Sequence, residues 1–139
     1  MKECIFCKIA EKEIPADIVY EDSRIMVFLD VNAASNGHTL VIPKKHYETI
    51  NEIPDSLLGE IAKVIKKVSK GVLKATNCKD FNLLQNNGKA AGQFVMHAHF
   101  HIIPRKEKDG LTLGSFPGKK YENNENKDIT RKIRYALTE

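Results

Sequence analysis

The sequence has no tryptophan, few aromatic residues and no long apolar run. Aromatic residues make up 7% of the 139 positions. No apolar run approaches the ~18 residues that a membrane-spanning helix needs, so we expect no membrane partner. The first residues, MKECIFCKIAEKEIP, carry charges where a secretion signal needs an apolar core. These absences lead us to expect a cytoplasmic protein.

The chain also lacks a glycine-rich phosphate loop and a carboxylate cluster suited to Mg²⁺, which excludes the common metal-dependent routes to phosphate transfer. Neither sign of charge dominates the sequence. The 22 basic and 18 acidic side chains give a net charge of +4. Such a balance differs from the basic stripe of a nucleic-acid binder, so no nucleic-acid partner is expected. The length and the 42% apolar content suit a single globular domain.

Cysteine is scarce as well, and two of the three cysteines form a Cys-x-x-Cys at Cys4 and Cys7. In a cytosolic protein this spacing favours a metal or redox site over a disulfide. A closed tetrahedral zinc site needs two further ligands, for which His46 and His97 are candidates. Because Cys7 has apolar neighbours, a pair of buried thiols is the alternative. Cys78 is expected to be a core thiol.

Short runs of β-branched and other apolar residues, separated by turn residues, predict a sheet of about five strands. The expected strands are 18–21, 25–29, 38–42, 81–86 and 95–103. Between 54 and 75, apolar residues recur every three or four positions, which predicts an amphipathic helix with Pro54 in its first turn. A short second helix is expected over 128–137. Hairpins with one long helix indicate an α+β domain with an antiparallel-dominated sheet.

The stretch HAHFHIIPR places three of the chain's five histidines at two-residue spacing. Alternate residues of a strand share a face, so His97, His99 and His101 are expected in a row with steps of about 6.7 Å. One alternative is a row of surface histidines. The other is a site that uses imidazole as nucleophile, acid, base or metal ligand. Rings that point the same way converge poorly on one metal, which favours giving one end of the row to zinc.

The residues His97 to Ile103 fit the His-φ-His-φ-His-φ-φ signature of the histidine triad (HIT) family. The stretches CIFCKIAEKEIPADIVYEDSRIMVFLDV, GHTLVIPKKH and NNGKAAGQ resemble, in the same order, segments of its nucleotide-binding, purine nucleoside phosphoramidase-like branch. The resemblance covers residues 1–105, which are expected to form a HIT domain with a HIT-like fold. Residues 106–139 are expected to be a variable polar tail, packed on the domain or on a partner subunit.

The resemblance implies a homodimeric hydrolase or transferase that cleaves a nucleoside 5′-monophosphate from its leaving group, with a purine nucleotide such as AMP as substrate or product. His99 matches the nucleophile that forms a nucleotidyl-histidine. His101 matches the residue that contacts the phosphate or leaving group, with His97 completing the triad, and His38 matches a supporting histidine. The structural zinc site of some bacterial members matches Cys4, Cys7, His46 and His97.

The resemblance also implies the nucleotide-binding residues. Asp30 would bind the ribose hydroxyls, and Asn86 and the backbone of Gly92 and Gln93 would contact the phosphate. Phe94, which follows this pair, is also expected among the nucleotide-binding residues. The base pocket would comprise Ile5, Phe6, Ile9, Ile14, Phe28 and Val31. From the residues alone, Asp30 is equally a turn former, and the apolar residues are candidate core.

The sequence departs from the family pattern at two places. Phe94 stands where the family has a serine or threonine next to the phosphate, and the tryptophan-containing tail of the animal proteins is missing. The alternatives are therefore a dinucleoside polyphosphate hydrolase and a nucleotide-binding module with vestigial catalysis.

Overall fold

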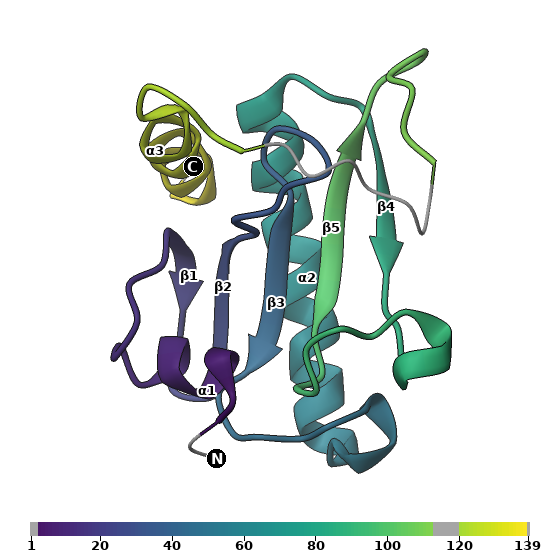
Figure 1. The fold of residues 1–139 in the computed structure, drawn as a ribbon. Coiled ribbons are helices and arrows are strands. Elements are labelled where there is room, and N and C mark those ends of the chain that lie inside the picture. Colours follow the sequence, from purple (N-terminus) through teal and green to yellow (C-terminus); the bar gives the residue numbers. More distant parts are fainter. Residues whose placement is uncertain (1–2, 113–119, 139) are drawn as a thin grey trace.

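The computed structural model describes residues 3–112 and 120–138. Five antiparallel strands form one sheet in the order β1-β2-β3-β5-β4 (Figure 1). The strands are β1 (Ile18–Glu21), β2 (Ile25–Leu29), β3 (Thr39–Pro43), β4 (Asp80–Leu84) and β5 (Phe100–Arg105). The helices are α1 (Ile5–Ala10), α2 (Asp55–Thr76) and α3 (Glu125–Leu137), with 3-10 turns at Ile50–Glu52 and Lys89–Ala91. The predicted α+β class and antiparallel sheet are confirmed.

The largest departure from the predicted elements lies in the histidine segment. The strand was expected from 95 to 103, but β5 begins only at Phe100, so His97 and His99 precede it. Residues before Phe100 turn away from β3, because the backbone N–H of Ala98 donates to the carbonyl of Tyr47 at 2.7 Å instead. Of the three histidines, only His101 lies in a strand. The predicted row on one strand face is therefore wrong.

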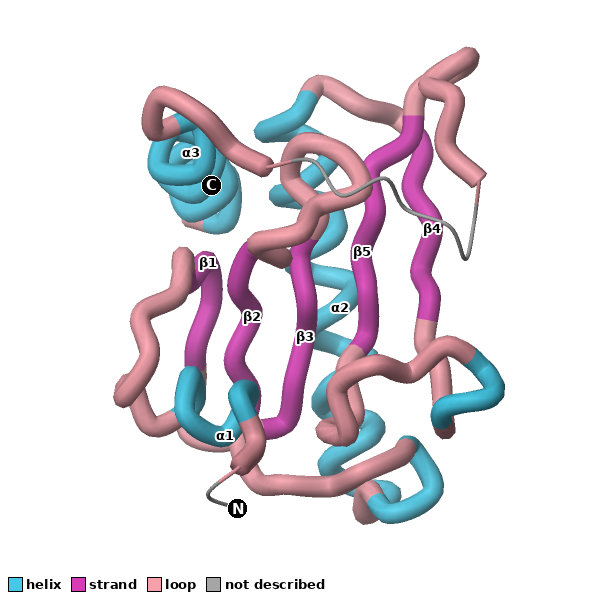
Figure 2. Tube along the Cα trace, in the orientation of Figure 1, coloured by secondary structure: helices cyan, strands magenta, loops and turns pink. Residues whose placement is uncertain are grey.

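The sheet separates two cores. The larger one is formed by one face of the sheet with the helices α2 and α3; in Figure 2, α2 passes behind the sheet and α3 lies at upper left, above β1. It is built from the apolar face of α2 together with Ile129 and Ile133 of α3. The smaller core lies on the opposite face, where Phe6 and Ile9 of α1 pack on Met26, Phe28, Leu40 and Ile42. The histidine His101 pairs with Leu40 across β3 and β5, which places it on the face that carries α1.

Helix α1 was not predicted from the sequence. It has six residues, and its N-terminal cap is a cysteine: Cys4 Sγ accepts from the backbone N–H of Cys7 at 3.4 Å. Cysteine is not among the residues that signal a helix start, so the sequence offers little warning of this helix. Its consequence is that the Cys-x-x-Cys pair lies on one turn.

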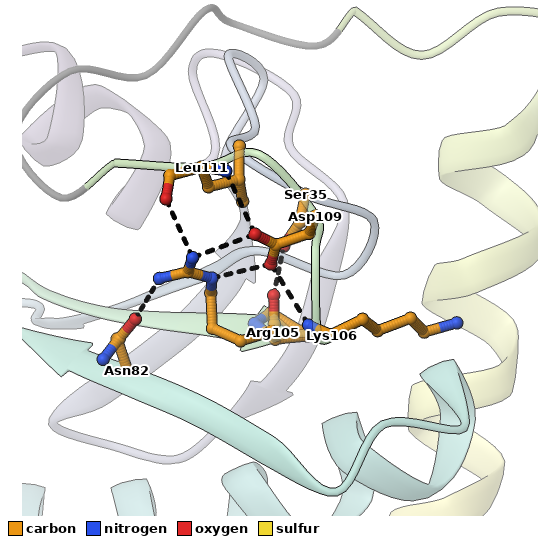
Figure 3. Close-up of polar contacts among 7 residues, drawn as sticks. Ser35, Asn82, Arg105, Lys106, Asp109 and Leu111 are labelled. Atoms are coloured by element: carbon orange, nitrogen blue, oxygen red, sulfur yellow. Dashed lines mark hydrogen bonds and ion pairs between the residues drawn. The ribbon is translucent and has the colours of Figure 1, made fainter.

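The end of β5 is fixed by Arg105 (Figure 3). Its Nε and Nη2 donate to the two carboxylate oxygens of Asp109 at 2.8 and 2.9 Å, and Nη1 donates to Asn82 Oδ1 at 2.6 Å. Nη2 also donates to the carbonyl of Leu111 at 2.9 Å. The guanidinium holds the pKa of Asp109 well below its ordinary value. This fork ties β5 to β4 and to the loop that follows it.

The described part of the expected tail packs on the domain. Helix α3 lies against α2 and β1. Asn126 and Lys127 both reach the carboxylate of Asp17 at 2.9 Å, and Arg134 Nε donates to the carbonyl of Ile18 at 2.7 Å. The predicted helix over 128–137 is present and begins three residues earlier. Within the described residues, no helix combines the length and apolarity that crossing a bilayer requires.

Two glycines of α2 provide a matched test of the packing between α2 and α3. A Cβ at Gly71 would lie 2.7 Å from Leu137 Cδ2, whereas one at Gly59 would meet nothing within 4 Å. We expect Gly59→Ala to raise the free energy of unfolding by about 1 kcal/mol, because alanine is the better helix former. Gly71→Ala should lower it, because overpacking against α3 costs about 1–3 kcal/mol. Urea unfolding measures both; equal gains would contradict the packing of α3 on α2.

Candidate active site and metal centre

The histidines of the site are buried. His38 and His97 have no exposed surface and His99 has 6%, while His101 is half-buried. Phe6 of α1 covers this group: its ring meets the ring of His99 edge to face at a centroid distance of 5.1 Å. The alternative of three surface histidines is therefore wrong. Buried imidazoles need hydrogen-bond partners, and these partners define what each ring can do.

His99 is held by the backbone of His97. Its Nδ1 lies 2.7 Å from the carbonyl oxygen of His97, and a carbonyl can only accept. The proton of neutral His99 is therefore on Nδ1, and Nε2 carries a free lone pair. Burial lowers the pKa of His99, which keeps the ring neutral near pH 7. His99 thus has the protonation state of a nucleophile.

His101 has the opposite tautomer. The backbone N–H of Ala34 donates to His38 Nδ1 at 2.9 Å, so the proton of His38 is on Nε2. That proton is donated to His101 Nδ1 at 2.9 Å, which leaves the proton of His101 on its own Nε2. Burial lowers the pKa of His38 to about 4 and that of His101 to about 3. Both rings are neutral, and His101 offers an N–H donor.

The rings of His99 and His101 offer complementary groups to a ligand between them. The two rings lie 5.0 Å apart, so an imidazole lone pair stands beside an imidazole N–H. Asp30 Oδ2 lies 3.6 Å from His38 Nε2, and its negative charge partly offsets the effect of burial on the pKa of His38 and of His99. The arrangement suits attack on an electrophile whose developing negative charge accepts a hydrogen bond.

The residues predicted to bind zinc come together. Cys4, Cys7, His46 and His97 offer ligand atoms that all lie within 4.8 Å of one another. The sulfur-to-Nδ1 distances are 3.3 Å for Cys4–His97, 3.4 Å for Cys7–His46 and 3.6 Å for Cys7–His97. Tetrahedral zinc with ordinary Zn–S and Zn–N bonds separates such atoms by about 3.6 Å. The donor set therefore fits zinc.

The surroundings of this cluster support the same conclusion. His97 Nε2 donates to the carbonyl of Pro43 at 2.8 Å, which leaves Nδ1 unprotonated and directed at the two sulfurs. Metal-ligating histidines are commonly oriented by such a bond. Burial raises the pKa of Cys7 to about 11, so a thiolate there needs a cation beside it.

A second group of possible ligands does not fit a metal. Asp30, His38 and His101 also bring ligand atoms within 4.8 Å of one another. His38 Nδ1, however, accepts the backbone N–H of Ala34, so His38 Nε2 must hold the proton. A metal needs the lone pair that this proton occupies. The group is better described as a hydrogen-bonded relay.

The loop residues expected to contact phosphate are partly engaged elsewhere. The backbone N–H groups of Gly92 and Gln93 donate to the carbonyls of Lys89 and Gly88 at 3.0 Å. The side chain of Gln93 is buried, and its amide bonds to Gly88, Glu48 and Val95. Gln93 therefore orders the loop through both its side chain and its backbone N–H.

Asn86 keeps more of its hydrogen-bonding capacity than Gln93. Its Nδ2 is 3.5 Å from the carbonyl of Gly92, at the limit of a hydrogen bond. Phe94, two residues beyond Gly92, is 93% exposed, so its ring does not fill the space beside the histidines. Of the predicted phosphate contacts, the side chain of Asn86 is the one that the structure leaves available.

The residues expected to form a base pocket are divided. Phe6, Ile9 and Phe28 are buried in the smaller core, and Ile14 packs beside them. Ile5 and Val31 are 47% and 80% exposed. Asp30 forms the turn that was its alternative role, because its Oδ1 accepts from the backbone N–H of Asn32 at 2.9 Å. The four buried or packed residues are therefore part of the core, as their alternative role predicted, and Ile5 and Val31 are the two that stay exposed.

The functional groups that the sequence did not reveal belong to the backbone. The N–H of Ala34 and the carbonyls of Pro43 and His97 decide which nitrogen of three histidines carries the proton. Every residue has these groups, so no residue type could have signalled them.

The neutral histidines predict acid sensitivity. Unfolded His38 and His101 take up protons below about pH 6.5, whereas the folded rings resist protonation until pH 3–4. Because the unfolded state binds more protons in this window, the free energy of unfolding decreases as the pH is lowered, by about 1.4 kcal/mol per pH unit for each ring. Urea unfolding at several pH values measures the slope. His101→Asn removes one titrating ring and should reduce this slope by the share of one ring, about 1.4 kcal/mol per pH unit. An unchanged slope would contradict a neutral buried His101.

Comparisons with known proteins agree with this site. Residues 11–108 match the sequence profile of the HIT domain. An uncharacterized HIT-like protein of Methanocaldococcus jannaschii is 54% identical over 107 residues, covering 77% of this chain and 82% of the relative. The adenosine 5′-monophosphoramidase of Schizosaccharomyces pombe is 44% identical over 117 residues, covering 82% of this chain and 85% of the relative.

A solved structure supports the same assignment. A Zn-bound histidine triad family protein from Mycobacterium smegmatis superposes with a TM-score of 0.87 at 31% identity, covering 99% of this chain and 94% of the other. With the triad His97, His99 and His101 assembled as described and two thirds of the chain matching the family profile, this protein belongs to the HIT family.

Proposed function

We propose that this protein is a nucleotide hydrolase of the HIT type that cleaves a nucleoside 5′-monophosphate from its leaving group, with a phosphoramidate as the preferred substrate class. The observation that carries the proposal is the pair of opposite tautomers at His99 and His101. The name of the Schizosaccharomyces pombe relative supports the choice of leaving group.

The reaction proceeds in two displacements. His99 Nε2 attacks the α-phosphorus, the bond from phosphorus to the leaving nitrogen breaks, and this nitrogen takes up a proton from solvent and departs as a neutral amine. The ring becomes positively charged, which the carbonyl of His97 and the negative charge of Asp30 both favour. His101 Nε2–H donates a hydrogen bond to the oxygens that gain charge. Water then attacks the phosphorus, loses a proton and displaces neutral His99, which releases the nucleoside monophosphate.

Substrate contacts follow from the groups left available. Asp30 keeps lone pairs beyond the bond to Asn32, and these accept from the ribose hydroxyls. Asn86 donates to the phosphate. The exposed side chains of Ile5 and Val31 contact a purine base. The 93% exposure of Phe94 counts against vestigial catalysis, because its ring does not cover the histidines.

A structural zinc ion held by Cys4, Cys7, His46 and His97 is part of the proposal. When bound, the ion supplies a cross-link between the N-terminal turn and the segment that precedes β5. His97 connects this cluster to the nucleophile, because its ring faces the sulfurs and its carbonyl holds His99.

The homodimer implied by the family also belongs to the proposal. Strand β4 is an edge of the sheet, and its side chains Phe81 and Leu83 are 36% and 53% exposed. Exposed apolar side chains on an open edge are suited to pairing with a second copy. Light scattering should give twice the chain mass, and Leu83→Lys should shift it toward the monomer; a monomeric wild type would contradict a dimer.

Removal of the nucleophile gives the first test. We expect His99→Gly to lose at least ~10⁴-fold in kcat on adenosine 5′-phosphoramidate, because no other group can form the covalent intermediate. AMP should still bind to this variant. Added imidazole should restore part of the turnover, and acid-quenched wild type should carry an adenylyl group by mass spectrometry.

The substrate class is decided in the same assay. Diadenosine polyphosphates turned over faster than the phosphoramidate would favour the dinucleoside polyphosphate hydrolase. Binding of AMP by the wild type with no turnover of either substrate would contradict catalysis and leave a binding module. Wild-type activity in His99→Gly without imidazole would contradict the covalent mechanism.

The zinc site is tested with a matched pair of cysteine variants. Metal analysis should find about one zinc per chain, and Cys4→Ser should lose the metal together with thermal stability, because binding free energy is also folding free energy. Cys78→Ser, which changes a thiol outside the cluster, should keep the metal. A metal-free wild type that is as stable as the protein supplied with zinc would contradict the site.

A further inference from the structure

A basic groove lies on the opposite side of the sheet from the histidines. Helices α2 and α3 pack on the larger core, and their outer faces meet over a hollow of about 460 Å³. It adjoins a second hollow of about 610 Å³, since Lys74 and Ala136 line both. We call the two together the α2–α3 groove. Its lining residues are Lys63, Lys66, Lys67, Lys70, Gly71, Lys74, Ala75, Arg131, Lys132, Tyr135, Ala136 and Leu137.

The groove concentrates positive charge. Seven of its lining residues are lysine or arginine, and none of the lining residues in the described parts of the chain is acidic. The whole chain carries only +4, so the rest of the protein has a net negative charge. The modest total conceals this separation, which explains why composition gave no indication of a polyanion partner.

Some of these charges are balanced and others are not. Glu60 lies 3.6 Å from Lys63, and Asp128 pairs with Arg131 and Lys132 at the rim. Among the described residues, Lys66 and Lys70 have no acidic partner. They stand four positions apart on α2, where like charges destabilise a helix. From Ile61 to Thr76 the helix has five lysines and no acidic residue. A bound anion would relieve this repulsion.

The floor and one wall of the groove are apolar or aromatic. Gly71 allows close approach of α3, since a Cβ there would lie 2.7 Å from Leu137 Cδ2. Tyr135 is 69% exposed and stands beside Arg131 in the second hollow. An exposed aromatic ring among cations is the combination that binds single-stranded nucleic acid, with bases stacked on the ring and phosphates on the lysines.

We propose that the α2–α3 groove binds a single-stranded polynucleotide. From Lys63 to Lys74 the helix provides a basic track about 16 Å long. A flexible strand follows this concave track and places its phosphates along it. A membrane surface is too flat to reach the floor of the groove, and an acidic peptide lacks the flat base that Tyr135 suits. The proposal is independent of the histidine site, which lies on the other face of the sheet.

The test is binding of a labelled oligouridylate of about 12 nucleotides to the full chain, followed by fluorescence anisotropy at about 50 mM salt. We expect Lys66→Glu/Lys70→Glu to weaken binding at least tenfold and to reduce the salt slope by about 1.4, because two phosphate contacts are lost. Lys106→Glu/Lys108→Glu makes the same change in charge on the loop after β5 and should weaken binding less than threefold. Tyr135→Ala should weaken binding several-fold with an unchanged salt slope.

Several outcomes would overturn the proposal. The first is that the wild type does not bind the oligouridylate. The second is that the two charge-reversal pairs weaken binding equally. The third is that a duplex or polyglutamate binds more tightly than the single strand. Circular dichroism and turnover of adenosine 5′-phosphoramidate serve as controls. Both should be unchanged in Lys66→Glu/Lys70→Glu, since these side chains lie on the surface of α2.

Discussion

The site depends on one constraint, which is that backbone groups fix the proton on each buried imidazole. The carbonyl of His97 holds the proton of His99 on Nδ1, and the N–H of Ala34 sends the proton of His38 toward His101. Neutral imidazole has two tautomers, and the proposed mechanism needs the one that leaves a lone pair on His99 Nε2 and the one that puts a proton on His101 Nε2. Burial then keeps all of these rings neutral. Without these hydrogen bonds, the same three histidines would have no fixed division of roles.

His97 takes part in both the candidate metal site and the histidine site. Its ring lies between Pro43 and the sulfurs of the Cys-x-x-Cys turn, and its carbonyl holds His99. The candidate metal site and the proposed nucleophile therefore both depend on one residue. The sheet separates two sides of the protein, because the histidines and α1 lie on one face while α2 and α3 cover the other. A chemical site and a charged surface can coexist on such a small domain because the sheet lies between them.

The sequence was sufficient to predict the hairpin, the long helix, the antiparallel sheet and four residues that come together as a possible metal site. Periodicity reports burial, and Cys4, Cys7, His46 and His97 are residue types with little other reason to occur together. The regular strand expected at His97 was wrong because Ala98 bonds to a loop, and no pattern of side chains encodes that choice. Helix α1 was missed because its N-terminal cap is a cysteine, which is not a usual helix-start signal. The engagement of Gln93 was missed because its side-chain amide donates to the carbonyl of Glu48, which is distant in sequence.

The most direct test of this account is the protonation of the ring nitrogens at neutral pH, measured by ¹⁵N NMR on the histidines. The account predicts that His99 is protonated at Nδ1 and bare at Nε2, and that His101 is protonated at Nε2 and bare at Nδ1. A proton on Nε2 of His99, or a positively charged His101, would contradict it, because the nucleophile or the donor would then be missing.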